Sequence, residues 1–270
     1  MTARDNEALR ALFALPPIPA SASTAVAVAE APRPEVITGN QEVDSVLWLQ
    51  RIVDTGDQSL IDKAMEAVKR ITTPMDELGR RYGAHVARST GSTMVGAFAS
   101  FGFGDLEDQA RRAIEKAARR HEALARFGSA EQAAAETPAE KACKNALRGL
   151  KRDKDWGRYD DNDARARLAA RPELSPSTID DCLYARAYWT KLYWLRSATT
   201  GHGDARPAGS AHDDFCYAML AHLQPRNGTE AISAFDHLDA DDGTDWERSQ
   251  PIIRNLIASG WKDRSGEAEA

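Results

Sequence analysis

Residues 105–128, DLEDQARRAIEKAARRHEALARFG, carry the pattern that decides the fold class. Apolar side chains recur every three to four positions, at Leu106, Ala110, Ala113, Ile114, Ala117, Leu124 and Phe127. Asp105 precedes them as a capping residue, acidic side chains occupy the first turn, and Gly128 follows the last turn. The stretch therefore predicts a long amphipathic helix with one buried side.

The same periodicity continues on both sides of this stretch. It recurs in residues 41–55, 57–71, 138–150, 177–198, 210–223, 228–238 and 244–261, and no stretch shows the strict alternation that is typical of a strand. Thr73 before Pro74 and Glu77 also predicts the start of a helix. We therefore expect an all-α fold of about ten helices, arranged as one multi-helix bundle or as two helical subdomains.

The N-terminal 40 residues differ in composition from the rest. Residues 15–40, LPPIPASASTAVAVAEAPRPEVITGN, are rich in Pro, Ala and Ser and predict a disordered tether. Residues 6–14 can form a short helix with Leu9, Leu12 and Phe13 on one side; a frayed tail is favoured over a docking peptide. The expected organisation is a flexible segment over 1–40 and helical regions over 41–128 and 138–262.

Charge and cysteine usage narrow the functional classes. The net charge is −6, which disfavours nucleic-acid binding by the chain as a whole. Residues 141–158 are basic and 204–247 acidic, so the two segments could dock on each other or meet a ligand. The three scattered cysteines (Cys143, Cys182 and Cys216) fit a reducing compartment, and no signal peptide or membrane span is recognised. We expect a cytoplasmic protein with no membrane partner.

Residues 74–96 partly resemble the spacing of a DNA-binding helix-turn-helix. Gly79 and Gly83 have the separation of the small helix residue and the turn glycine. Ser89 falls where an aliphatic residue is expected, and Gly91 would weaken a recognition helix. An ordinary helix followed by a Gly-rich turn is therefore the favoured interpretation. In the DNA-binding interpretation, the contact residues would be Arg80, Arg81, His85 and Arg88.

The basic segment 141–158 offers a second candidate surface for nucleic acid. Four basic side chains would share one face of a continuous helix: Lys144, Arg148, Lys151 and Arg152. Trp156 and Tyr159 follow, and such a combination of cations with aromatics is typical of single-strand binding. The favoured interpretation is a solvated helix face followed by an acidic turn.

A helix rich in aromatic residues lies in residues 179–196. Its aromatic side chains are Tyr184, Tyr188, Trp189, Tyr193 and Trp194. They point nearly all round the helix, which indicates burial on several sides or a surface for a protein partner.

Polar residues that could serve catalysis or metal binding are few. The candidates are His202, His212, Asp213, Asp214, Cys216 and His222. His212 and Cys216 would share a helix face, but no third and fourth ligand complete a recognisable set, so an acidic helix start is the favoured interpretation. No phosphate-binding loop, nucleophile elbow or zinc-protease motif is present. We therefore predict no catalytic residue, no cofactor and no metal.

These observations favour a non-catalytic helical regulatory or adaptor protein that acts through protein–protein contacts. The alternative is a DNA-associated regulator that uses residues 74–96 and 141–158. An enzyme in which His212, Asp213 and either His202 or His222 converge is the third hypothesis.

Overall fold

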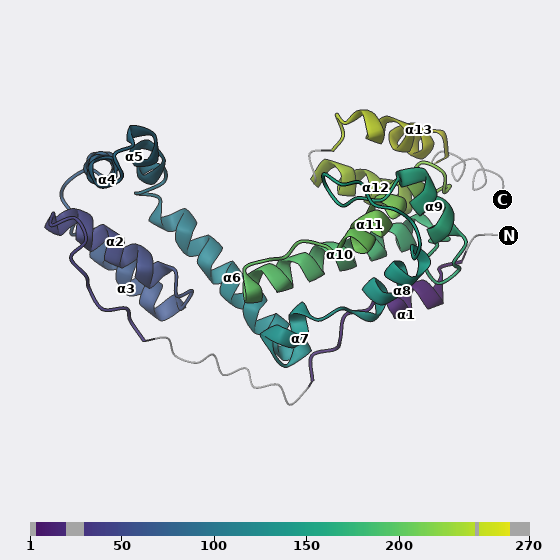
Figure 1. Ribbon diagram of the computed structural model, residues 1–270, viewed down its shortest axis with the longest axis horizontal. Coiled ribbons are helices and arrows are strands. Elements are labelled where there is room, and N and C mark those ends of the chain that lie inside the picture. The colour runs from purple at the N-terminus through teal and green to yellow at the C-terminus, as the bar shows by residue number, and fades with distance from the viewer. Residues whose placement is uncertain (1–3, 20–29, 241–242, 260–270) are drawn as a thin grey trace, which may run out of the picture. The chain divides into compact units, whose positions relative to one another are not determined.

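The computed structural model describes residues 4–19, 30–240 and 243–259. Over these residues the chain forms thirteen α-helices and one 3-10 helix, and it has no β-strand (Figure 1). The prediction of an all-α fold is confirmed. The expected tether falls partly on residues 20–29, and the end of the expected C-terminal region on residues 260–262, which lie outside the described residues.

The chain divides into two compact units, which we name by their place in the sequence. The inserted unit is Pro19–Ala125, and the C-terminal unit combines Met1–Ile18 with Arg126–Ala270. The C-terminal unit is therefore discontinuous in sequence, because the N-terminal helix packs with the second half of the chain.

The inserted unit contains most of the helices of the first half of the chain. They are α2 (Gln41–Val53), α3 (Gln58–Val68), α4 (Met75–Thr90), α5 (Thr93–Ser100) and most of α6 (Leu106–Phe127). Apolar residues of α2, α3 and α6 form one buried cluster that includes Ile52, Ile61 and Leu106. A second cluster joins α2 to α4 through Val46, Leu78 and nearby residues. The apolar residues that recur at helical spacing in the sequence thus form two small hydrophobic cores.

The start of α4 differs from the expected one. Pro74 is the N-cap residue and makes no side-chain capping bond. The Thr73 hydroxyl instead donates a hydrogen bond to Glu42 of α2 at 2.6 Å. Thr73 therefore ties two helices together rather than capping one.

The C-terminal unit is built around α10, a 22-residue helix (Ile179–Thr200). Around it are α1 (Glu7–Leu12), α7 (Ala130–Ala134), α8 (Pro138–Ala146), α9 (Asp161–Ala169), α11 (Pro207–Met219), α12 (Gly228–Ala240), η1 (Glu247–Ser249) and α13 (Gln250–Ser259). Helix α1 lies against α10, although about 170 residues separate them in the chain (Figure 1). One continuous core results, in which all three cysteines are buried and unbridged.

A buried ion pair fixes α8 to α10. Glu140 belongs to a capping box with Thr137 at the start of α8, and Arg196 of α10 donates to both of its carboxylate oxygens at 2.7 and 2.8 Å. Burial alone would raise the pKa of Glu140, but the bonds and charges of its partners hold that pKa below its usual value. Arg196 also donates to the carbonyl of Ala133, so the same side chain holds α7.

Candidate functional site

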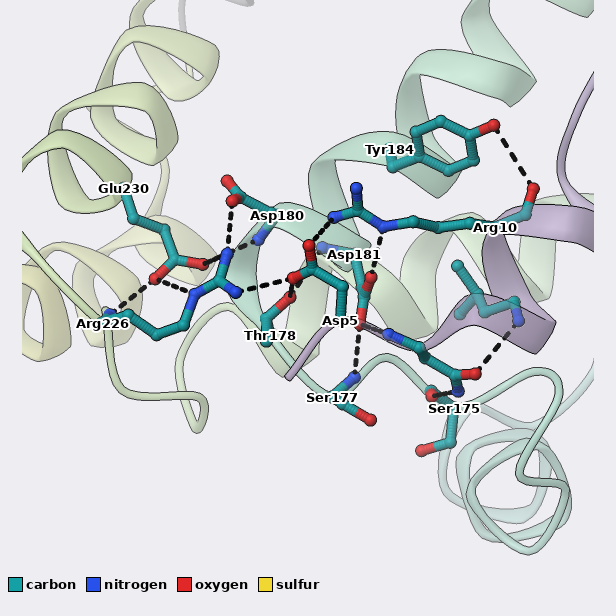
Figure 2. A network of polar contacts seen from close by, with 12 residues as sticks. Asp5, Arg10, Ser175, Ser177, Thr178, Asp180, Asp181, Tyr184, Arg226 and Glu230 are labelled. Atoms are coloured by element: carbon teal, nitrogen blue, oxygen red, sulfur yellow. Dashed lines mark hydrogen bonds and ion pairs between the residues drawn. The ribbon is translucent and has the colours of Figure 1, made fainter. Parts of the chain in front are cut away.

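A network of polar contacts joins α1 to the rest of the C-terminal unit, which lies more than 150 residues later in the chain (Figure 2). Asn6 begins it. Its side chain caps α1 by accepting the Leu9 N–H at 3.1 Å, and its amide nitrogen donates to the carbonyls of Pro172 and Ser175 at 2.6 and 2.9 Å. Asn6 therefore both caps the N-terminus of α1 and binds this helix to the loop before α10.

Asp181 of α10 is the buried centre of this site. Its carboxylate accepts the backbone N–H of Asn6 at 2.8 Å, the Ser177 N–H at 3.1 Å and Nε of Arg10 at 2.9 Å. A buried carboxylate is costly unless donors surround it, and here two of its three donors come from the α1 segment. Docking of α1 is thus what satisfies this charge.

Arg226, just before α12, joins the N-terminal segment to the remaining carboxylates. It makes ion pairs with Asp5 at 2.8 Å and Glu230 at 3.2 Å, and it also pairs with Asp180 (Figure 2). Burial would lower the pKa of Arg226, but its three carboxylate partners together raise the pKa above its usual value. Thr178, the N-cap residue of α10, donates its hydroxyl to Asp5 at 2.9 Å.

Two apolar side chains of the N-terminal segment complete the docking. Leu9 and Phe13 are 0% and 1% exposed. The Phe13 ring stacks on His212 at 4.5 Å between centroids and meets the rings of Tyr188 and Trp189 edge-on at 5.4 and 5.5 Å. The segment therefore forms part of the core, which corrects the expectation of a frayed tail. The expected short helix with Leu9 and Phe13 on its buried side is present.

His212 is a neutral structural residue in this pocket. Its Nδ1 lies 3.2 Å from Nε1–H of Trp189, which donates to it, so Nε2 carries the proton and donates to the Leu174 carbonyl at 2.9 Å. Complete burial lowers the pKa of His212 to about 4. Cys216 lies beside the imidazole and is also fully buried.

The other residues of the metal and catalysis hypotheses do not gather around His212. His202 and His222 are exposed, and Asp213 pairs with Arg186 at 3.3 Å. Within the described residues no group of three or more His, Cys, Asp or Glu side chains is arranged to hold a metal ion. The convergence that the enzyme hypothesis requires is therefore not observed.

The structure splits the aromatic helix into two sets. Tyr188 and Trp189 are buried around Phe13, and Tyr188 also donates its hydroxyl to Thr137 at 2.8 Å. Tyr184, Tyr193 and Trp194 are 36%, 38% and 41% exposed. Tyr184 bonds the Arg10 carbonyl at 3.3 Å, so it too belongs to the α1 site.

Residues 74–96 do not have helix-turn-helix geometry. Helix α4 continues through Gly83 to Thr90, and the chain turns at Gly91 in the left-handed conformation. Gly83 instead faces Gly96 of α5, where a Cβ on Gly83 would lie 2.7 Å from the Gly96 carbonyl oxygen. The turn predicted for the DNA-binding interpretation is therefore wrong; the two glycines allow close packing of an antiparallel helix pair.

The four residues proposed as DNA contacts all lie on α4. Arg80 and Arg81 are exposed and both pair with Glu77. His85 is half-buried, and Arg88 is exposed and donates to the Ala84 carbonyl.

Helix α5 presents apolar side chains to solvent. The exposed fractions are 69% for Met94, 46% for Val95, 71% for Phe98 and 84% for Phe101. No charged residue occurs between Ser89 and Gly104. We call these four residues the α5 apolar face. The sequence showed the composition, but Gly83 and Gly96 decide which side of α5 is buried, so the exposed side could not be assigned in advance.

The basic segment does not form one helical face. Helix α8 ends at Ala146, so Lys144 lies in its last turn and Arg148 just beyond it. Lys151 and Arg152 are in the following loop, which an isolated bridge between Arg152 and Tyr159 closes. The prediction of a shared face is wrong, because Gly149, at φ +89°, is in a backbone conformation that a helix cannot contain. All four side chains are exposed.

Comparison with known proteins finds no relative of this chain. No family model, no curated protein and no solved structure matches the chain. None of the helices in the described part of the chain has the length and apolar character needed to cross a membrane.

Proposed function

We propose that this chain is a non-catalytic helical adaptor that binds a protein partner through the α5 apolar face. The observation that carries the proposal is the exposure of Phe98 and Phe101, at 71% and 84%, on a helix with no charged residue. Exposed apolar patches on a soluble unit are typical of interaction sites, and aromatic side chains supply much of the binding energy in such sites.

The charges around the face favour a protein over an anionic membrane. Asp105, Glu107 and Asp108 follow α5 in the sequence after residues 101–104, and the chain carries a net charge of −6. Helices that bind an anionic bilayer usually carry Lys and Arg beside their apolar side chains, and α5 has neither. The expected partner surface is therefore apolar and uncharged at its centre.

The DNA-associated alternative has less support. It would require binding that weakens steeply with salt and that loss of Arg80, Arg81 and Lys151 reduces. These side chains are exposed, but neither the helix-turn-helix turn nor the shared basic face that motivated it is present.

Site-specific photocrosslinking tests the proposal. A photoreactive phenylalanine analogue is placed at position 98 in the full chain, and at position 232 as a control, because Ile232 is also exposed (62%) but lies on α12. In cells that express the protein naturally, position 98 should yield a covalent adduct of defined mass that position 232 does not yield.

A substitution gives the matching test of affinity. Phe98→Ser together with Phe101→Ser should weaken binding of the crosslinked partner by about a hundredfold or more, because about 1.5–3 kcal/mol is lost for each of the two buried aromatics. Ile232→Ser should leave it unchanged. The same adducts at both positions, or none at position 98, would refute the proposal.

A further inference from the structure

A cleft of about 740 Å³ opens in the C-terminal unit beside the end of the basic segment. Its walls come from the 156–159 turn, the first turns of α9 and α11, and residues near α13, including Arg248. The volume lies within the range that small-molecule sites commonly have. It is separate from the α5 apolar face, which belongs to the other unit.

An exposed tryptophan stands at the mouth of this cleft on an ordered turn. Trp156 is 81% exposed. The Asp153 carboxylate accepts the backbone N–H groups of Trp156, Gly157 and Arg158 at 2.5, 3.0 and 3.0 Å, and the N–H bond from Trp156, more than any other cause, holds the pKa of Asp153 below its usual value. These bonds order the backbone of the turn and leave the indole exposed to solvent. An exposed tryptophan is suited to stacking on a planar ring.

The cations of the cleft exceed its anions. Arg165 lies 4.0 Å from Asp161, and Arg248 lies 3.8 Å from Asp214. The Arg158 guanidinium has no hydrogen-bond or ion-pair partner among the described residues, so the lining carries an excess positive charge in a chain of net charge −6. Pro207, Ser210 and Ala211 at the start of α11 also line the cleft, and the backbone N–H groups of Gly209 and Ser210 there donate to the Arg206 carbonyl at 2.8 and 3.0 Å.

The floor of the cleft is lined by small apolar side chains. Ala211, Ala218 and Ala221 of α11 and its continuation leave room above them, and the buried Tyr217 ring lies beside them. Tyr217 is held by its hydroxyl bond to Ser249 at 2.6 Å and by the Arg248 guanidinium 4.6 Å from its ring centre. The alanine side chains and Tyr217 thus give the cleft an apolar surface against which a flat ring can lie.

We propose that this cleft binds a nucleotide-type phosphate ester, with the ring against Trp156 and the alanine floor and the phosphate at Arg158. Asp161 and Asp214 are placed to accept N–H or O–H groups of the base or sugar. The ligand can be a free nucleotide or the phosphorylated end of a single strand, since both present the same ring and phosphate.

Calorimetric titration of the full chain tests the proposal, with AMP, adenosine, inorganic phosphate and a 5′-phosphorylated single-stranded oligonucleotide as probes. AMP or the oligonucleotide should bind, with quenching of tryptophan fluorescence, and adenosine and phosphate should each bind more weakly. Tighter binding of AMP identifies a free nucleotide as the ligand, and tighter binding of the oligonucleotide identifies a strand end.

Two exposed residues provide the variants. Trp156→Ala and Arg158→Gln should each weaken binding by about tenfold, whereas Arg120→Gln, an exposed arginine of α6 in the inserted unit, should not change it. Absence of binding to AMP and to the oligonucleotide at millimolar concentration would overturn the proposal. So would equal binding of AMP and phosphate, or equal weakening by Arg120→Gln.

Discussion

At the scale of single residues, the docking of the N-terminal segment depends on Phe13 more than on any other apolar side chain. Phe13 is almost completely buried among three rings. Phe13→Ala should lower the free energy of unfolding of the C-terminal unit by about 3–5 kcal/mol, because it removes that burial and leaves a cavity. Urea unfolding followed by tryptophan fluorescence measures the loss. Ile232→Ala, at an exposed position of the same unit, should change stability by no more than about 0.5 kcal/mol. Similar losses for both variants would contradict the docking.

His212 makes stability depend on pH. Its pKa is about 4 in the folded chain and 6.5 when exposed, so the unfolded chain binds a proton first. The free energy of unfolding therefore keeps the full contribution of neutral His212 above pH 6.5. As the pH falls from 6.5 towards 4, the free energy of unfolding decreases by roughly 3 kcal/mol in total. Denaturant unfolding at a series of pH values, with NMR of the imidazole, measures both effects. Protonation of the folded imidazole near pH 6.5 would refute this assignment.

The capping patterns of the sequence correctly predicted where two helices begin. Asp105 accepts the Asp108 N–H at the start of α6, and the Thr137 and Pro138 signal marks the start of α8. The sequence did not indicate Asp181 or Arg226 as site residues, because their partners are distant: the bond from Asn6 to Asp181 spans 175 positions. The sequence feature that does point to this site is the pattern of a short capped helix with a buried side, in which Asn6 is followed by Leu9 and Phe13.

At the scale of elements, close packing of α4 on α5 sets which side of α5 faces solvent. Gly83→Ala would place a methyl group 2.7 Å from the Gly96 carbonyl oxygen, a backbone atom that cannot move away alone. We expect a loss of about 1–3 kcal/mol in the stability of the inserted unit, although alanine is the better helix former. Thermal unfolding by circular dichroism is the measurement. The matched control is Gly228→Ala on α12, where no atom lies within 4 Å of the added methyl group. A stabilising Gly83→Ala would show that the helices are not packed at this point.

Helix periodicity predicted the elements better than it predicted their ends. The sequence was compatible with a turn at Gly83 and with Gly79 as the small residue of the preceding helix, but both glycines are buried inside α4, and Gly83 allows the close approach of α5. The prediction of one continuous helix over the basic segment was wrong for the opposite reason. There Gly149 ends the helical conformation, although the residues around it have a helical pattern. The meaning of a glycine depends on what packs against it, and a single sequence does not contain that information.

At the scale of the whole molecule, the N-terminal helix makes the C-terminal unit discontinuous. The inserted unit is consequently joined to the C-terminal unit at both of its ends, by the segment after α1 and by α6. The unit that carries the α5 apolar face is thus inserted between two parts of the C-terminal unit in the sequence rather than appended at one end of the chain. The organisation was not predictable from composition, since residues 15–40 have the character of a tether whether or not α1 docks.

Amide hydrogen exchange of residues 9–13 in the intact chain measures the docking of α1 directly. An isolated six-residue helix is too short to protect its amides in water, so protection there requires the contacts with α10. The expected result is slow exchange of the Arg10 and Phe13 amides, close to that of buried α10 amides, and its loss in Phe13→Ala. Exchange of these amides at the rate of an unstructured peptide would contradict the discontinuous C-terminal unit.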